Sequence, residues 1–185
     1  MFYMTVDDEI KLKLLEKRDA EDVYSILDKN RDYLREWLPW VDGMKSKEDY
    51  HPVIEMWLKQ FAANDGFQVG IYYKEKFVGM VGFHEFNWGH KQTTIGYWLD
   101  GASQGKGIMT RCVNALLKYA FEELKLNRVE IRCGEKNFKS RAIPERLEMK
   151  HEGTIRDGEF LYDHFINSYV YSMLAKEWFE KNNKC

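Results

Sequence analysis

The hydrophobic and polar positions along the chain predict a series of strands and helices. In some segments hydrophobic residues occupy every second position, which is typical of a strand with one buried face. In others they recur at intervals of three and four residues, which is typical of a helix with one buried stripe. Strands are predicted at residues 10–15, 67–73, 76–86, 93–99, 128–133, 149–156 and 168–174. Helices are predicted at residues 20–27, 50–61, 109–124 and 140–147.

Two short segments refine the first half of this pattern. Pro52 disfavours a helix that starts at Ser46, so the second helix is expected to begin near Asp49, with Pro52 in its first turn. Residues 33–40 are rich in aromatic side chains and contain a proline, and they are expected to form a loop. No internal repeat interrupts the series of elements.

Length and composition narrow the class of protein. The 185 residues are most simply one domain, 1–185. No block of Lys and Arg suggests nucleic-acid binding, and no apolar run is long enough to span a membrane. The three cysteines lack the spacing of a metal site, so no metal is expected. An acidic N-terminus without a signal peptide and the sparse cysteines favour a cytoplasmic protein.

The segment from Asp100 to Gly107 links a predicted strand to a strongly amphipathic helix. Its glycines allow backbone N–H groups to converge, and the start of the helix adds free N–H donors and a positive dipole end. Such a loop binds phosphate groups, so a phosphorylated ligand is expected here. A tight strand-to-helix turn without a ligand is the alternative interpretation.

The spacing of this loop excludes two common nucleotide sites. A nucleotide P-loop needs four residues between its glycines and a hydroxyl residue after the lysine. Here Gly101 and Gly105 are one residue too close, and Gly107 stands at the hydroxyl position. A dinucleotide fingerprint needs a third glycine at position 110, which is Thr110.

The chain resembles the GNAT superfamily of N-acetyltransferases, and within it the Rim-type enzymes that acetylate the N-termini of ribosomal proteins. The resemblance covers essentially the whole chain. The motifs that carry it are Ile95-Gly96-Tyr97-Trp98-Leu99-Asp100, Gln104-Gly105-Lys106-Gly107-Ile108, Leu126-Asn127-Arg128-Val129-Glu130-Ile131-Arg132, the pair Asn137 and Ser140, and Trp37-Leu38-Pro39-Trp40. It implies a mixed α/β fold whose central sheet is mostly antiparallel, splays at its middle and is flanked by helices, in the order β-α-α-β-β-β-α-β-α-β-β.

The resemblance also implies that acetyl-CoA is the acyl donor. In the family, the loop amides bind the pyrophosphate and the preceding strand pairs with pantetheine. The residues implicated by position are Trp98, Leu99, Gln104, Gly105, Lys106, Gly107, Ile108, Met109, Thr110 and Asn137. The family loop often opens with Gln or Arg, and here that position is Ala102.

Ser140 is the residue that the resemblance assigns to the leaving thiolate. Pro144 stands where many members of the superfamily carry a tyrosine acid, which makes Ser140 the better candidate. Asn137 is expected to contact pantetheine or to order water. Either residue could instead cap the helix that follows.

The general base is harder to assign. Many relatives carry a glutamate where this chain has Thr94, which cannot act as a base. The resemblance to the Rim branch implies Glu159 as the base, with Asp163, Glu85 and His84 as competitors. Because successive side chains of a strand point to opposite faces, at most one of His84 and Glu85 is expected to face the cleft.

The acceptor is a primary amine, expected to be a protein N-terminus, in a pocket framed by Trp37, Trp40, Glu85 and Trp88. For the tryptophans, ordinary packing is an equal alternative. A small amine such as a polyamine, an amino acid or an aminoglycoside is the second possible acceptor. A third alternative for the function is a coenzyme A-binding module without catalytic activity. A homodimer is expected if a strand near 168–174 is exposed.

Overall fold

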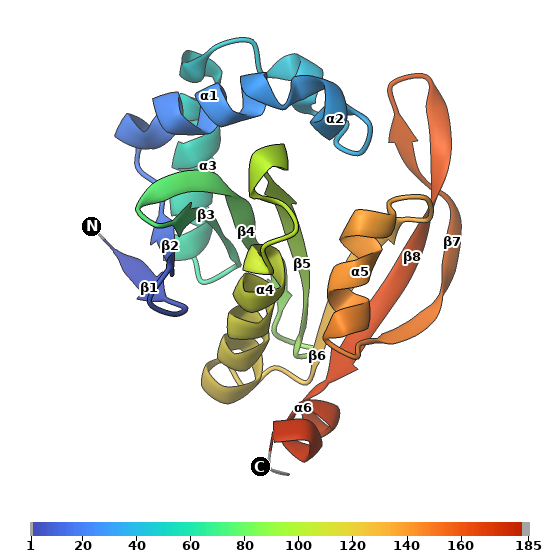
Figure 1. The fold of residues 1–185 in the computed structure, drawn as a ribbon. Coiled ribbons are helices and arrows are strands. Elements are labelled where there is room, and N and C mark those ends of the chain that lie inside the picture. The colour runs from blue at the N-terminus through green and yellow to red at the C-terminus, as the bar shows by residue number, and fades with distance from the viewer. Residues whose placement is uncertain (1, 183–185) are drawn as a thin grey trace.

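A computed structural model describes residues 2–182 (Figure 1). Its eight strands form one sheet in the order β1-β2-β3-β4-β5-β6-β8-β7, in which the β5–β6 pair is parallel and the other pairs are antiparallel. The strands are β1 Tyr3–Thr5, β2 Ile10–Leu14, β3 Phe67–Tyr73, β4 Lys76–Asn87, β5 Gln92–Leu99, β6 Arg128–Gly134, β7 Lys150–Leu161 and β8 His164–Leu174. The helices are α1 Ala20–Lys29, α2 Arg31–Arg35, α3 Tyr50–Ala62, α4 Ile108–Lys118, α5 Phe138–Arg146 and α6 Ala175–Asn182. The predicted fold class is confirmed.

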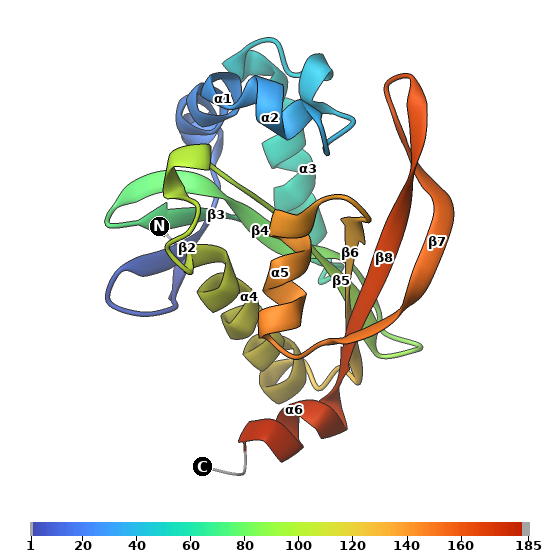
Figure 2. The same ribbon diagram turned by 45° about the vertical axis from the view of Figure 1, so that its right-hand side comes forward.

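Helices cover both faces of the sheet, and each face has its own hydrophobic cluster (Figures 1 and 2). One cluster contains the buried stripe of α4, and the other contains the buried residues of α1 and α3. Strand β5 contributes side chains to both clusters. Ile95 belongs to the α4 cluster and Trp98 to the α1–α3 cluster, because neighbouring residues of a strand point to opposite faces. The alternation along β5 therefore sets which residues reach each side.

The sheet splays between β5 and β6. The two strands pair only from Gln92 to Ile95, which lie opposite Arg128 to Ile131. Beyond Ile95 strand β5 keeps its bonds to β4, while residues 132–134 of β6 pair only with β8. The last four residues of β5 therefore have a free backbone edge that faces a gap.

Several predicted elements differ from the structure. Residues 31–35 form the short helix α2, so the predicted loop at 33–40 is wrong at its start, where Leu34 is buried. The helix predicted at 109–124 ends as an α-helix at Lys118 and continues as a π-turn. Strand β1 and helix α6 had no sequence prediction. Pro52 does lie in the first turn of α3, as predicted.

The β7–β8 hairpin is longer than predicted and leaves the body of the sheet (Figure 2). Its outer half, residues 157–167, buries only Leu161, so it lacks the alternation by which a strand is recognised. Strand β8 lies between β6 and β7. The premise of an exposed strand at 168–174 is therefore wrong, and β7 forms the edge; dimerisation itself stays a prediction. Within residues 2–182, no helix is long and apolar enough to cross a membrane.

Candidate active site

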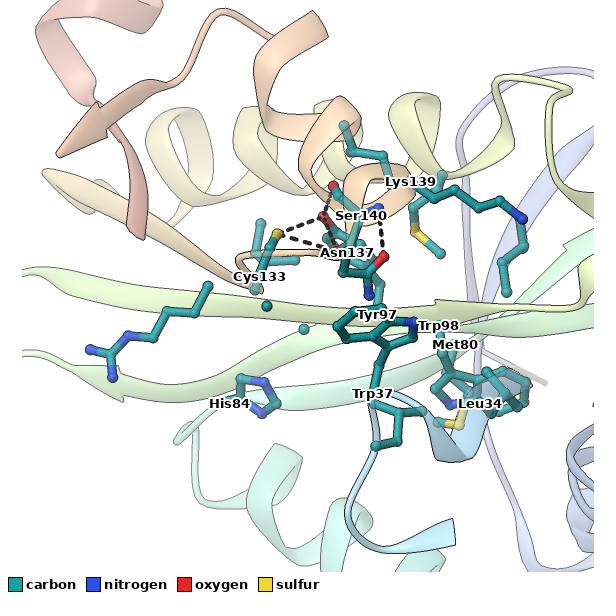
Figure 3. A pocket seen from close by; sticks show the side chains of 18 of the residues that line it. Leu34, Trp37, Met80, His84, Tyr97, Trp98, Cys133, Asn137, Lys139 and Ser140 are labelled. Atoms are coloured by element: carbon teal, nitrogen blue, oxygen red, sulfur yellow. Dashed lines mark hydrogen bonds between the residues drawn. The ribbon is translucent and has the colours of Figure 1, made fainter. Parts of the chain in front are cut away.

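The gap between β5 and β6 opens into a cavity of about 2310 Å³ (Figure 3). Pockets for one drug-sized ligand measure about 300–1,000 Å³, so this cavity has room for two substrates side by side. Its wall includes the glycine loop and α5 on one side, and α2, α3 and the β7–β8 hairpin on the other. The two sides meet at the splayed end of β5.

The glycine loop has the geometry of an anion site. Gly105 and Gly107 adopt left-handed φ angles of 75° and 70°, which favour glycine, and a Cβ on either would meet no atom within 4 Å. Gly107 is the N-cap of α4, and no side chain caps that helix. The first-turn N–H groups of α4, on Ile108, Met109 and Thr110, therefore lack a helical acceptor. An open backbone cradle with free donors fits a pyrophosphate.

A buried polar cluster fixes the start of this loop. The Asn30 amide, at the junction of α1 and α2, donates to Asp100 Oδ1 at 2.8 Å, and its carbonyl accepts from the Gly101 N–H at 2.9 Å. Ser103 Oγ donates to Asp100 Oδ2 at 3.1 Å. This cluster has no local sequence signal, because Asn30 and Asp100 are seventy positions apart in the chain.

Asn137 and Ser140 lie at the start of α5, across the gap from β5 (Figure 3). Asn137 is the N-cap of this helix, and its side chain accepts from the Ser140 N–H at 3.1 Å. Ser140 does not cap: its Oγ lies 3.2 Å from Cys133 Sγ and 3.4 Å from the Tyr97 hydroxyl. The helix-cap interpretation thus holds for Asn137 only.

Pro144 explains why Tyr97 points at α5. A proline has no N–H, so Pro144 leaves the Ser140 carbonyl without its bond from four residues later in the helix. The Tyr97 hydroxyl donates to that carbonyl at 3.0 Å. Burial raises the pKa of Tyr97 well above its usual value and also raises the pKa of the Cys133 thiol. Both groups are therefore neutral at physiological pH.

Glu159 lies on β7 and faces the cavity, opposite Ile166 of β8 and just after an irregularity in the hairpin ladder. It is half-buried, and this burial raises the pKa of its carboxyl. Asp163, another sequence candidate, lies at the exposed hairpin tip with its carboxylate 2.7 Å from the His164 ring.

The expectation that only one of His84 and Glu85 faces the cleft is wrong. The ladder between β4 and β5 shifts between Phe83 and Phe86, and both intervening residues line the cavity. A bulge of this kind breaks the alternation from which the expectation was drawn.

The three tryptophans of the predicted acceptor pocket do not all lie there. Trp37 and Trp40 line the cavity, and the Trp37 indole lies against Gly134 at the end of β6. Trp88 lies outside the residues that line it: its indole N–H donates to the Asn64 carbonyl at 2.9 Å and its ring packs against Phe86.

The tip of the β7–β8 hairpin contacts α2 and the loop that follows it, and so spans the acceptor end of the cavity. The Tyr162 hydroxyl donates to the Leu38 carbonyl at 2.7 Å, and the Arg35 guanidinium lies 3.9 Å from the centre of the Tyr162 ring. Of this bridge, only Leu38 belonged to a motif quoted from the sequence; Arg35 and Tyr162 were not singled out. Among residues 2–182, no group of three or more His, Cys, Asp and Glu side chains could hold a metal ion.

Comparison with known proteins agrees with this geometry. The model of the acetyltransferase (GNAT) domain matches residues 9–150. A Bacillus subtilis (strain 168) protein named "Putative ribosomal N-acetyltransferase YdaF" is 36% identical over 96% of this chain and 98% of its own length. The ribosomal-protein-serine acetyltransferase of Escherichia coli (strain K12) is 24% identical over 91% of this chain and 94% of its own length.

A solved structure of a similar protein contains the acyl donor acetyl-CoA. The microcin C7 self-immunity acetyltransferase MccE, in complex with acetyl-CoA and AMP, is 28% identical, covers 91% of this chain and 94% of its own, and superposes with a TM-score of 0.89. The family match covers well over half of the chain, and the open glycine loop fits the pyrophosphate of the same donor. The chain therefore belongs to the GNAT family and is an N-acetyltransferase that uses acetyl-CoA as its acyl donor.

Proposed function

We propose that this enzyme acetylates the N-terminal α-amino group of a protein, with a ribosomal protein as its acceptor in the cytoplasm. The observation that carries the proposal is the continuous cavity, with the donor loop at one end and an aromatic acceptor end beneath the hairpin at the other. The names of the Bacillus subtilis and Escherichia coli relatives support the choice of acceptor.

The donor end is assigned to the loop and the splayed strand. The loop and first-turn amides bind the pyrophosphate, and the free edge of β5 pairs with pantetheine. The residues proposed to contact the donor are Trp98, Leu99, Gln104, Gly105, Lys106, Gly107, Ile108, Met109, Thr110 and Asn137. Lys139, whose ammonium donates to Gln104 Oε1 at 2.9 Å, adds positive charge beside this end.

Ser140 is proposed to stabilise the leaving group. The acceptor nitrogen attacks the thioester carbonyl carbon, the bond from this carbon to sulfur breaks, and the nitrogen loses a proton. The Ser140 hydroxyl already lies beside a sulfur atom, that of Cys133, at 3.2 Å. A thiolate at that side of the gap would receive the same hydrogen bond, which is stronger to an ion than to a neutral group.

The acceptor end favours a chain terminus. The bridge between Tyr162 and Leu38 spans this end, so an extended N-terminus enters more easily than a lysine within a folded surface. Trp37 and Trp40 supply flat apolar walls, and the carboxylates of Glu85 and Glu159 attract an ammonium group. Because an α-amino group has a pKa of about 7.7–8.0, a weak base is enough to deprotonate it.

A panel of amines tests the acceptor. A peptide that begins with serine, the same peptide with a blocked N-terminus and an internal lysine, and spermidine are each offered with acetyl-CoA. Turnover of the free-N-terminus peptide at least tenfold above the other two is expected. Preference for spermidine would replace this proposal with a small-amine acetyltransferase, for which the acidic side chains around the acceptor end are the supporting feature.

A further inference from the structure

Strand β4 has a bulge at His84 and Glu85, and both residues line the cavity. The ladder between β4 and β5 is regular from Gly79 to Phe83 and resumes at Phe86, so His84 and Glu85 together lie opposite the single residue Thr94. Bulges re-aim side chains and often occur next to active sites. Here the bulge is level with the end of the β5–β6 pairing, where the gap begins.

Three side chains hold the bulge in one conformation. The carbonyl of Phe83 accepts from Gln68 Nε2 at 3.2 Å, and the carbonyl of Glu85 accepts from Thr93 Oγ1 at 2.6 Å. Between them, the carbonyl of His84 accepts from Gln60 Nε2. The consecutive carbonyls that the irregular ladder would leave open are thus each bonded by a side chain, so the direction of the His84 side chain is fixed.

The fixed direction places the His84 ring over Gly96. A Cβ at Gly96 would overlap Nε2 of His84 and lie only 2.7 Å from Cε1, so the ring occupies the space that any other residue at 96 would fill. Gly96 is the first residue of β5 beyond the pairing with β6. Figure 3 shows His84 on the opposite side of these strands from Ser140 and Cys133.

The ring is chemically free. Among residues 2–182, no hydrogen bond or ion pair to an imidazole nitrogen of His84 is formed, so a lone pair is available. The charged side chains that line the same cavity near the acceptor end are Glu36, Asp65, Glu85, Arg132 and Glu159. Partial desolvation by the cavity wall, not any of these charges, lowers the pKa of His84 below its usual value of about 6.5, so the ring is neutral at physiological pH.

We infer that His84 is the general base of the reaction, taking the proton of the acceptor amine directly or through one water at the splay point. This inference rests on the proposed function. A neutral imidazole nitrogen accepts the proton as the nitrogen–carbon bond forms, and the ring returns it to solvent after the product leaves. Ser140 acts from the other side of the strands, so proton removal and sulfur departure occur on opposite sides of the thioester. Glu159 then serves to attract the ammonium rather than to deprotonate it.

The pH dependence of H84Q tests this role, with H90Q as the matched control, because His90 lies in the exposed turn after β4 and outside this cavity. H84Q should lower kcat with a serine-terminated peptide about a hundredfold, within the range of general-base catalysis. The acid side of log kcat/KM should have a limiting slope of two in the wild type, from His84 and the peptide amine, and of one in H84Q. H90Q and E159Q should keep the slope of two.

Two measurements do not depend on turnover. Imidazole NMR, with His84 assigned by the signal lost in H84Q, should give a titration midpoint below 6.5 that matches the second ionisation of the wild-type rate profile. Calorimetry should give the same acetyl-CoA affinity for H84Q and wild type. G96A should displace the ring, lower kcat about as much as H84Q, and add little further loss in the double variant.

The outcomes separate the two proposals. A wild-type enzyme that acetylates the peptide, with H84Q within threefold of it and still showing a slope of two, would overturn the role of His84 and leave the function intact. Loss of the second ionisation in E159Q in place of H84Q would also overturn it, in favour of Glu159. A wild-type enzyme that binds acetyl-CoA but acetylates no amine in the panel would overturn both.

Discussion

Replacing Asn30 with alanine should disable the donor loop from a distance. Asn30 is nearly buried, and its side chain makes three hydrogen bonds: to the Ile26 carbonyl at 2.8 Å, to Asp100 Oδ1 at 2.8 Å, and from the Gly101 N–H at 2.9 Å. Alanine would leave a buried carboxylate oxygen and a backbone donor without partners. Each such group costs about 1–3 kcal/mol.

The expected loss of stability is therefore about 2–6 kcal/mol, reduced if water enters the space. Part of this destabilisation is local, so the glycine loop leaves its binding conformation for part of the time. If that conformation is populated about a tenth of the time in the variant, the apparent Kd for acetyl-CoA rises about tenfold. N30D is the sharper comparison, because it keeps the shape but sets a second carboxylate against Asp100, and it should bind more weakly still.

Thermal melting and calorimetry with acetyl-CoA measure the two effects separately. S103A, which removes only the bond of 3.1 Å to Asp100 Oδ2, should show a smaller change in both. N30A with a lowered melting temperature but wild-type affinity would refute the reasoning, since the loop would then hold its shape without its anchor.

Three further changes address the site itself. G107V should weaken acetyl-CoA binding at least tenfold, because a branched side chain would obstruct the open cradle and resist the left-handed φ of 70°, and unchanged calorimetric affinity would contradict the loop assignment. S140A should lower kcat about ten- to a hundredfold with little change in acetyl-CoA affinity, as expected for the loss of one hydrogen bond to an ion. The control S25A, on the exposed face of α1, should leave kcat unchanged. A retained kcat in S140A would make Ser140 a packing residue. E159Q should raise the melting temperature at pH 7 but not at pH 4. The pKa of Glu159 is raised in the folded state, so its ionised form destabilises the fold once the pH rises above that pKa. An equal change in melting temperature at both pH values would exclude this cause.

The parts of the site that the sequence predicted are those made by neighbours in the chain. Gly105, Gly107 and the first turn of α4 form a cradle through local backbone geometry, and local geometry is visible in spacing. Periodicity predicted the individual helices and strands, whereas the fold class was implied by the resemblance. Trp37 and Trp40 were found by the same local motif, and both line the cavity.

What the sequence could not predict depends on contacts between distant segments or on broken periodicity. The pairing of Asn30 with Asp100 arises only when the helices close over the sheet. The bulge at His84 and Glu85 is invisible to a rule that assumes strict alternation. The outer half of the β7–β8 hairpin buries only Leu161, so its strands carry no alternating pattern. Trp88 was misplaced because an aromatic residue near a cleft motif does not show which way its side chain points.

The hydrogen bond between Tyr97 and the Ser140 carbonyl should make Tyr97 and Pro144 vary together among related sequences, because Pro144 leaves that carbonyl without a helical donor. A proline inside a helix ordinarily weakens it. Here Pro144 leaves the Ser140 carbonyl free to accept from Tyr97 of β5, so α5 is hydrogen-bonded across the gap. A residue with an N–H in place of Pro144 would bond the Ser140 carbonyl within the helix and compete with the Tyr97 hydroxyl for it. Replacing Tyr97 would leave the carbonyl without its donor. Divergence at either position is thus expected to bring a compensating change at the other, and the pair should be gained or lost together among related sequences.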